Sequence, residues 1–259
     1  MSAISSQAPF DVVVIGGGPA GSTCAHTLAA AGHSVLVLEK TRHPRFHVGE
    51  SLVPYTTGLL EMMGLLDQVE NGPFVVKRSV ESQGADGDCF RTYFSSLAEG
   101  QRKFGFNVER APFDALLSAH AARAGACVIE DAEVRRVVVD GDRVTGVRYE
   151  HGQRIVEVRA PFVVDASGRA GLVARRFKLR VMNRRLKKVA VYQYFQAVAK
   201  GVNSSDEGDL VISTHEDGWI WCIPVGPDTR SVGAVMPAQV LAGRDQRQVF
   251  AEHVARSSL

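Results

Sequence analysis

The feature that most constrains this chain is a glycine-rich turn near its start. Residues 15–21 read Ile-Gly-Gly-Gly-Pro-Ala-Gly and directly follow the apolar run 12–15. A buried strand, a turn with glycines spaced as G-x-G-x-x-G, and a helix together bind the pyrophosphate of a dinucleotide. On this interpretation Gly16 allows the tight turn, Gly18 lets the backbone approach the pyrophosphate, and Gly21 lets the helix pack closely on the strand.

The residues after this turn complete a strand–helix–strand unit. Pro19 suits the first turn of a helix over residues 20–31, whose positive N-terminal end favours phosphate oxygens. A second apolar strand, residues 34–38, delivers Glu39 about 20 residues beyond the glycines, where a carboxylate binds ribose hydroxyls. This acid favours FAD or NAD over NADP, and a glycine-rich turn without a ligand is the alternative. The candidate cofactor-binding residues of this unit are Gly16, Gly18, Pro19, Ala20, Gly21, Glu39 and Lys40.

Composition and charge argue against several classes of protein. The 259 residues are 45% hydrophobic, which is enough for one large core or two domains. A formal net charge of +2 gives no reason to expect a nucleic-acid partner. The sequence has no apolar run long enough for stable membrane insertion, and its first residues lack the pattern of a signal peptide. We therefore expect a cytoplasmic protein.

The cysteines give no sign of a structural cross-link or a metal centre. The four are scattered and include no C-x-x-C pair, which is typical of a protein in a reducing compartment. The histidines show no metal-ligand spacing either, so we expect no metal site.

The order of the segments predicts a discontinuous nucleotide-binding domain. A glycine-rich turn followed by alternating apolar segments indicates an α/β protein, α+β overall. We expect a Rossmann-like domain with a parallel sheet, formed by residues 8–73 and 108–178. A second, mostly antiparallel β-sheet domain, formed by residues 74–107 and 179–259, interrupts it and carries the substrate side. This insertion argues against a simple dehydrogenase, whose nucleotide-binding half is usually one continuous block.

Hydrophobic periodicity predicts the individual elements. Helical spacing indicates helices over residues 55–69 and 109–124. Two alternating runs, 134–139 and 144–149, flank Asp140-Gly141-Asp142 and predict a β-hairpin. Further strands are expected at residues 127–130, 156–159, 162–164, 189–198, 210–214, 219–224 and 231–235.

Several segments carry a family resemblance. The glycine turn, the helix start 109–114 and the strand end 165–168 resemble FAD-dependent oxidoreductases of the aromatic-hydroxylase fold. Within that fold, segment 49–54 (Gly-Glu-Ser-Leu-Val-Pro) and segment 74–77 (Phe-Val-Val-Lys) resemble flavin-dependent halogenases of the tryptophan halogenase-like family. Segment 218–224 matches their W-x-W-x-I-P pattern, which is fairly specific. The resemblance runs from about residue 10 to the end, and geranylgeranyl-reductase-like flavoproteins share the fold.

The resemblance implies a cofactor and a reaction. FAD, reduced by a separate flavin reductase, would use dioxygen and halide to generate hypohalous acid. That oxidant would travel through the protein to a lysine beside a small aromatic substrate, either free or tethered to a carrier protein. An electron-rich carbon of a phenol, pyrrole or indole would then capture the halogen.

The resemblance also assigns roles to particular residues. Lys77 is the candidate for the catalytic lysine, acting as an ammonium that hydrogen-bonds hypohalous acid or as a neutral amine that forms a haloamine. The alternative is a surface lysine at the start of a strand. Glu50 and Ser51 resemble a flavin-loop element, with a Ser51 helix cap as the alternative.

Further positions near the predicted cofactor follow from the same match. Arg110 opens a helix and would reach a phosphate or ribityl oxygen, unless it is an ordinary surface arginine. Asp165 and Gly168 would lie near the cofactor, and the alternative is that Asp165 caps the next turn. Trp219 and Trp221 alternate on a strand, so both face one side, either lining the route from flavin to substrate or packing in the core.

The sequence departs from the family after the two tryptophans. It stops at Leu259 without the Gly-Asp-Ala segment with which members of this fold usually continue, so we expect a fragment or a truncated gene product. Three other functions stay open: a flavin monooxygenase, a geranylgeranyl-reductase-like enzyme, and an inactive FAD-binding module. Lys77 and the tryptophans argue against the first two.

Overall fold

The chain divides into two compact units, each built from two segments. The structure, a computed structural model, describes residues 10–97, 99–100, 102–183, 186–196 and 208–257. Unit 1 comprises Met1–His47 and Arg110–Val181, and unit 2 comprises Val48–Glu109 and Met182–Leu259.

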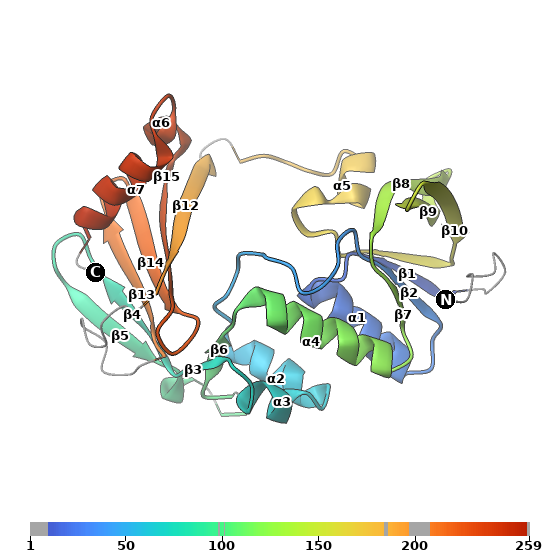
Figure 1. Cartoon of the computed structure of the whole chain (residues 1–259), viewed down its shortest axis with the longest axis horizontal. Coiled ribbons are helices and arrows are strands. Elements are labelled where there is room, and N and C mark those ends of the chain that lie inside the picture. Colours follow the sequence, from blue (N-terminus) through green and yellow to red (C-terminus); the bar gives the residue numbers. More distant parts are fainter. Residues whose placement is uncertain (1–9, 98, 101, 184–185, 197–207, 258–259) are drawn as a thin grey trace. The chain divides into compact units, whose positions relative to one another are not determined.

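Unit 1 is built on a four-stranded parallel sheet (Figure 1). Its strand order is β11 (Phe162–Asp165), β1 (Val12–Ile15), β2 (Val35–Leu38) and β7 (Cys127–Ile129). All residues of β1 and β2 are buried, because both faces of the sheet are covered. The Rossmann-like arrangement expected from the glycine turn is therefore present.

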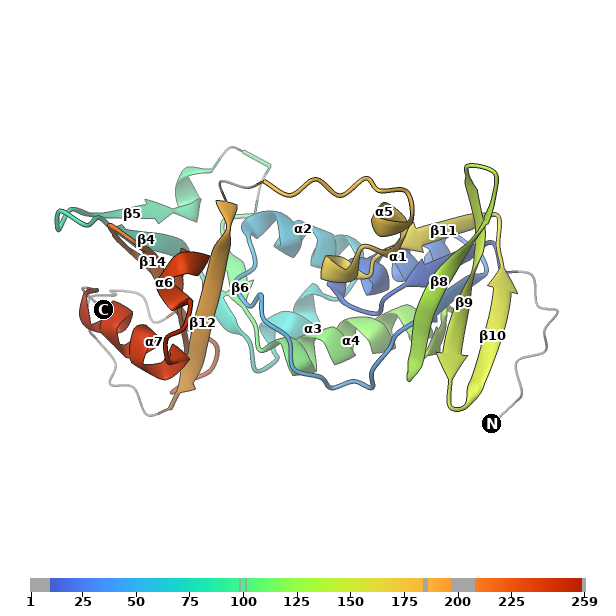
Figure 2. The same ribbon diagram turned by 90° about the horizontal axis from the view of Figure 1, so that it is seen from above.

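Two different layers cover this parallel sheet. Helices α1 (Pro19–Ala30) and α4 (Arg110–Arg123) pack side by side over one face, around Val14, Val37 and Ala121. A three-stranded antiparallel sheet covers the other, in the order β10 (Arg154–Arg159), β9 (Arg143–His151) and β8 (Ala132–Asp140). Figure 2 shows these three strands as one separate layer. The short η2 (Gly168–Ala170) and α5 (Leu172–Arg176) follow β11.

Unit 2 contains a six-stranded, mostly antiparallel sheet. Its order is β12 (Lys188–Phe195), β15 (Arg230–Pro237), β14 (Gly218–Pro224), β13 (Leu210–His215), β4 (Ser79–Gln83) and β5 (Cys89–Tyr93). Strands β13 and β4 are parallel, and the other neighbours are antiparallel. A separate pair joins β3 (Val75–Lys77) to β6 (Gly105–Asn107), and the remaining elements are α2 (Pro54–Met62), α3 (Leu66–Glu70), η1 (Phe94–Ser96), α6 (Ala238–Leu241) and α7 (Gln246–Ala255).

The two faces of the six-stranded sheet differ in chemistry. Ile220 and Met236 lie on the face that α6 and α7 cover, where they pack with Phe250 of α7. Because paired residues share a face, the strand registers place a second set of side chains on the opposite side. We call this side the aromatic face, and it carries Tyr192, Tyr194, Trp219 and Trp221.

Two boundaries differ from those that the sequence predicts. Residues 48–73 belong to unit 2 and not to the nucleotide-binding unit, because Leu52 N and Val108 N donate hydrogen bonds that tie residues 50–52 to the β6 segment. The single helix expected over 55–69 is two helices, since Gly64 has a φ of 67° between α2 and α3. The predicted β8–β9 hairpin is confirmed, as are strands β7, β10, β11, β13, β14 and β15.

Two further expectations concern the end of a strand and the membrane. The strand predicted for 189–198 is present as β12 up to Phe195, and residues from 197 lie outside the described part of the chain. Among the described residues, none of the helices is both long and apolar enough to cross a membrane.

Candidate functional site

The glycine turn of unit 1 has the close contacts that its spacing predicts. Gly16 has a φ of 100°, and a Cβ atom there would lie 2.5 Å from the carbonyl oxygen of Ala166. A Cβ atom on Gly21 would overlap the carbonyl oxygen of Gly16. The turn, helix α1 and the residues after β11 are therefore packed at backbone distance, which only glycine permits at these positions.

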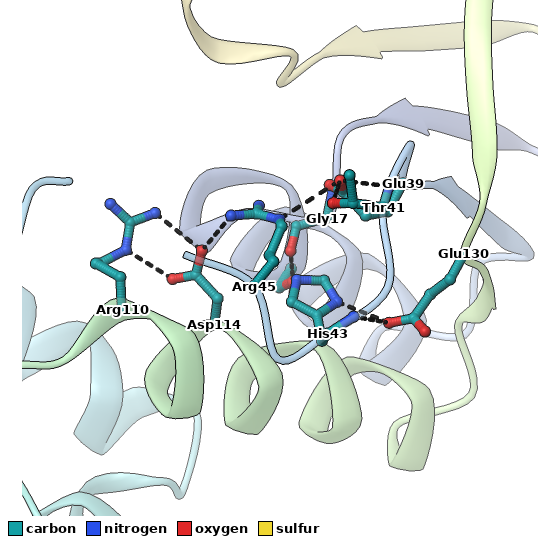
Figure 3. Close-up of polar contacts among 9 residues, drawn as sticks. Gly17, Glu39, Thr41, His43, Arg45, Arg110, Asp114 and Glu130 are labelled. Carbon is teal, nitrogen blue, oxygen red and sulfur yellow. Dashed lines mark hydrogen bonds and ion pairs between the residues drawn. The ribbon is translucent and has the colours of Figure 1, made fainter. Parts of the chain in front are cut away.

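Glu39 holds this turn from the end of β2 (Figure 3). The side chain is buried, and its Oε2 accepts a hydrogen bond of 2.7 Å from the backbone N–H of Gly17. Oε1 accepts from the backbone N–H and hydroxyl of Thr41, at 3.1 and 2.9 Å. Burial raises the pKa of Glu39, but these hydrogen bonds and the nearby Arg45 outweigh it, so the pKa lies below its ordinary value. The carboxylate is therefore ionised at neutral pH.

Arg45 is a positively charged side chain beside the turn that was not predicted from the sequence. Arg45 Nη1 lies 3.1 Å from Oδ2 of Asp114, and Arg45 Nε lies 3.5 Å from Oε1 of Glu39. A Cβ atom on Gly18 would lie 3.4 Å from Arg45 Nη2, so the guanidinium faces the glycine turn. The signal in the sequence was slight, because Arg45 is one of two arginines in a polar loop, residues 41–54.

Arg110 belongs to the same cluster. It is buried and donates from Nε and Nη2 to both carboxylate oxygens of Asp114, at 2.7 and 2.9 Å. Arg110 is therefore not an ordinary surface arginine, which was the alternative from the sequence. Figure 3 shows Asp114 between Arg110 and Arg45, with Glu39 on the far side of Arg45. Two guanidinium groups and two carboxylates balance in charge, which lowers the cost of burying them.

These residues fit FAD. Within the part of the chain that the structure describes, no side chain caps the N-terminus of α1 and no acid lies in its first turn. The amide groups there and Arg45, whose guanidinium faces Gly18, would hold the anionic pyrophosphate. Glu39 would hold ribose hydroxyls.

Other predicted residues of unit 1 have clear structural contacts. Asp165 accepts hydrogen bonds from the backbone N–H and hydroxyl of Ser167 and from the N–H of Val173, at 2.8 Å for the last. It therefore caps the turn that follows β11, and a contact of Asp165 with the cofactor stays a prediction. Gly168 has a φ of 60° in this turn, and Lys40 is exposed.

Lys77 of unit 2 is only 2% exposed, which is rare for a lysine. Its Nζ donates a hydrogen bond of 2.6 Å to Ser51 Oγ and lies 5.4 Å from the centre of the Phe94 ring. Burial lowers the pKa of Lys77 to about 8, while the negative charge of Asp209 acts in the opposite direction. Lys77 is therefore not a surface lysine, which was the alternative that the sequence left open.

The backbone around Lys77 explains how it reaches Ser51. Lys77 is paired with Gly105 across the β3–β6 pair, and Ser51 is paired with Asn107 on the other side of β6. A Cβ atom on Gly105 would lie 2.6 Å from the carbonyl oxygen of Leu52. Gly105 thus lets three extended segments pack closely.

Glu50, the neighbour of Ser51, contacts the aromatic face. It is 1% exposed, and its Oε1 accepts a hydrogen bond from the Tyr194 hydroxyl. Burial and this contact raise the pKa of Tyr194. Residues 50–51 therefore connect Lys77 on one side with the aromatic face on the other. The alternative in which Ser51 caps a helix is not seen, because the N-cap of α2 is Val53.

The two tryptophans lie together on the aromatic face. A Cβ atom on Gly233 would overlap the ring of Trp221, so that ring lies flat over the neighbouring strand. Trp221 Nε1 donates to Ser231 Oγ at 3.3 Å. Trp219 is 38% exposed, which argues against simple core packing.

The predicted site residues thus fall into two groups. Unit 1 holds Gly16, Gly18, Pro19, Ala20, Gly21, Glu39, Lys40, Arg110, Asp165 and Gly168, and unit 2 holds Glu50, Ser51, Lys77, Trp219 and Trp221. Sequence reasoning missed Arg45 and Asp114 in the first group and Tyr194 and Asp209 in the second.

Known proteins resemble the chain over nearly its whole length. Residues 9–258 match the FAD binding domain family. The 1H-pyrrole-2-carbonyl-(peptidyl-carrier protein) chlorinase of Pseudomonas fluorescens is 36% identical, over 93% of this chain and 58% of that protein. The tryptophan 2-halogenase of Chondromyces crocatus is 31% identical, over 93% of this chain and 46% of that protein.

Solved structures of flavin-dependent halogenases also resemble the chain. The myxobacterial chondrochloren halogenase CndH superposes with a TM-score of 0.88 at 34% identity, over 96% of this chain and 58% of that one. The flavin-dependent halogenase CmlS gives a TM-score of 0.89 at 32% identity, over 97% and 46%. The chain spans about half the length of the curated relatives that it matches. It belongs to the FAD binding domain family, with FAD as its cofactor and flavin-dependent halogenases as its relatives.

Proposed function

We propose that the protein containing this chain halogenates an electron-rich aromatic substrate, with Lys77 presenting the oxidised halogen. The observation that carries this proposal is the burial of Lys77 beside Ser51 in a chain whose relatives are halogenases. Burying an ammonium group is costly, so a lysine in such a position is a functional candidate.

Unit 1 would bind the cofactor. When bound in its reduced form, FAD would supply the two electrons that reduce dioxygen to the peroxide level, and halide would then be oxidised to hypohalous acid. The α1 N-terminus and Arg45 would bind the pyrophosphate, while Glu39 would orient the adenosine ribose. Arg110 orients Asp114 and, through it, Arg45.

Lys77 would act on the halogen donor. As an ammonium it has three N–H groups, and Ser51 uses one of them. A second N–H can donate to the oxygen of hypohalous acid, which draws electron density from the halogen and makes it more electrophilic. With a pKa of about 8, most of the lysine is protonated at neutral pH. The haloamine route needs the minor, neutral form.

The substrate and partners follow from the relatives and stay proposals. The Pseudomonas fluorescens relative is named for a pyrrole attached to a peptidyl-carrier protein, and the Chondromyces crocatus relative for tryptophan. We therefore propose a small aromatic substrate, free or carrier-tethered, and a separate flavin reductase. Four free cysteines are in keeping with a cytoplasmic location.

The test is a product assay on the natural protein that contains this chain. It is given FAD, a flavin reductase with NADH, chloride or bromide, and a panel of phenols, pyrroles and indoles, and products are analysed by mass spectrometry. We expect halogenated product that requires halide. Lys77→Met should lower turnover about 100-fold or more, the range seen for a lost proton donor, while the exposed Lys188→Met serves as the matched control. Hydroxylated product alone would identify a monooxygenase instead.

A further inference from the structure

Two histidines of unit 2 contact each other where helix α7 lies on the six-stranded sheet. His253 of α7 is only 1% exposed, and its Nδ1 lies 3.2 Å from Nε2 of His215, the last residue of β13. The centres of the two rings are 4.8 Å apart, and the rings are tilted by 52°. Because a buried imidazole needs a hydrogen-bond partner, this contact constrains the protonation state in which α7 can dock.

The contact between the two rings has a direction, which a third group determines. The backbone N–H of Asp217 donates to Nδ1 of His215 at 3.3 Å, so this nitrogen carries no proton. A neutral imidazole has one N–H, which therefore lies on Nε2 of His215 and donates to Nδ1 of His253. The proton of His253 then lies on its own Nε2. The three groups thus form a chain of hydrogen bonds from the β13–β14 turn to α7.

A proton added to His253 breaks this chain. Nδ1 is the ring nitrogen of His253 that has no proton, so an added proton would point at the N–H of His215 and leave two donors facing each other. It would also place a positive charge on a buried ring. The docked arrangement of α7 therefore accepts His253 only in its neutral form.

The charged groups around His253 do not compensate for this. Burial is the largest influence and lowers the pKa of His253; His215 and Arg256 lower it further, while Asp217 and Glu252 act in the opposite direction. Both carboxylates are already paired with arginines, at 3.0 Å for Asp217 and 2.6 Å for Glu252. Because the pKa lies below its ordinary value, the docked helix binds a proton less readily than a released one, and acid favours release.

Helix α7 also helps to cover the apolar face of the sheet, where Phe250 packs with Ile220 and Met236. We propose that the His215–His253 contact is a pH-sensitive latch, which docks α7 at neutral pH and releases it in mild acid. Release would expose the face of the sheet opposite the aromatic face. The latch goes beyond the proposed function, because no step of it involves FAD or halide.

Nitrogen NMR of the histidine rings tests the direction of the chain. The protein is made with ¹⁵N-labelled histidine, and the two signals are assigned by their loss in His215→Gln and His253→Asn. The chemical shifts of protonated and unprotonated ring nitrogens differ widely, so the position of each proton can be observed. At pH 7.5 both rings should carry their proton on Nε2. A proton on Nδ1 of either ring would overturn the proposal.

Hydrogen exchange tests the release of α7. Protection factors, which remove the intrinsic pH dependence of exchange, are compared at pH 7.5 and 5.5 for peptides covering α7 and, as an internal control, α2. At pH 5.5 a released histidine is protonated about ten times as often as it is neutral. We therefore expect the protection of α7 to fall by about threefold to tenfold and that of α2 to stay constant. An equal loss in both helices would mean that unit 2 loosens as a whole, and would count against a latch.

His253→Asn is the variant that isolates the histidine. The oxygen of asparagine can accept from His215 in place of Nδ1, but the amide does not titrate. The protection of α7 in this variant should therefore be the same at pH 5.5 and 7.5. His151→Asn removes an exposed histidine of unit 1 and is the matched control, in which α7 should lose protection as it does in the parent.

His215→Gln takes the place of His253→Asn if that variant does not fold. A glutamine amide can accept from protonated His253 as well as donate to the neutral ring, so the loss of α7 protection at pH 5.5 should be smaller than in the parent. Protection of α7 in the parent that is the same at both pH values would overturn the proposal. A loss of equal size in the parent and in the variant that folds would overturn it too.

Discussion

At the scale of single residues, Lys77 is a side chain whose burial opposes folding. Its pKa of about 8, against 10.5 for a free lysine, means that the folded state holds the proton less tightly than the unfolded state. That difference corresponds to roughly 3 kcal/mol of unfolding free energy. The hydrogen bond to Ser51 offsets about 1 kcal/mol of this cost of burying the ammonium group.

Lys77→Met should therefore stabilise the protein at pH 7, by about 1–2 kcal/mol. This advantage depends on pH. Between pH 8 and 10.5 the unfolded lysine binds more protons than the folded one, so the parent gains stability as pH rises. Guanidinium unfolding at pH 7 and pH 10 should show the advantage of the variant shrinking at the higher pH. A variant less stable than the parent at pH 7 would mean that the contacts of the ammonium outweigh its desolvation.

At the scale of elements, the β1–α1 turn depends on a helix packed at backbone distance. Gly21 lies inside α1 against Gly16. Gly58 lies inside α2, where an added Cβ atom would meet no atom of the described residues within 4 Å. The same substitution should thus have opposite effects in the two helices.

Gly21→Ala should abolish FAD binding and destabilise unit 1, because the added methyl group overlaps the carbonyl oxygen of Gly16. Gly58→Ala should raise the free energy of unfolding by about 0.5–1 kcal/mol, since alanine favours a helix. Flavin fluorescence titration and thermal melts compare the two. Normal FAD affinity in Gly21→Ala would show that α1 can move away from β1 without cost to the site.

At the scale of the whole molecule, each unit is built from segments far apart in sequence. The turn around Gly16 and the α4 cluster around Asp114 come together within unit 1, although 62 residues of unit 2 separate its two segments. Cofactor binding in unit 1 should therefore stabilise both segments at once.

FAD should slow amide hydrogen exchange at residues 16–22 and 39–45 of the first segment, where the turn, Glu39 and Arg45 lie, and at residues 110–114 of the second. At a concentration about 100 times Kd, the added stability should be about 2.7 kcal/mol. Peptides from β4 and β5 of unit 2 serve as the internal control. Protection confined to those control strands would place the nucleotide elsewhere.

Only part of the candidate site could be predicted from the sequence. The turn and Glu39 follow a local spacing, so their positions within the β1–α1–β2 unit could be predicted. The burial of Lys77 could not be predicted from the sequence, since it depends on the pairing of residues 50–52 with β6. Arg45 and Asp114 are 69 positions apart, and no local pattern pairs them.

Local signals in the amino-acid order were enough to specify the glycine turn, the β8–β9 hairpin and the strand that carries both tryptophans. Which charges meet depends instead on the folded chain, because the Arg45–Asp114 ion pair and the hydrogen bond from Ser79 to Asp209 join distant segments. The fold also assigns residues 48–73 to unit 2, through backbone hydrogen bonds to β6 that side-chain periodicity does not encode.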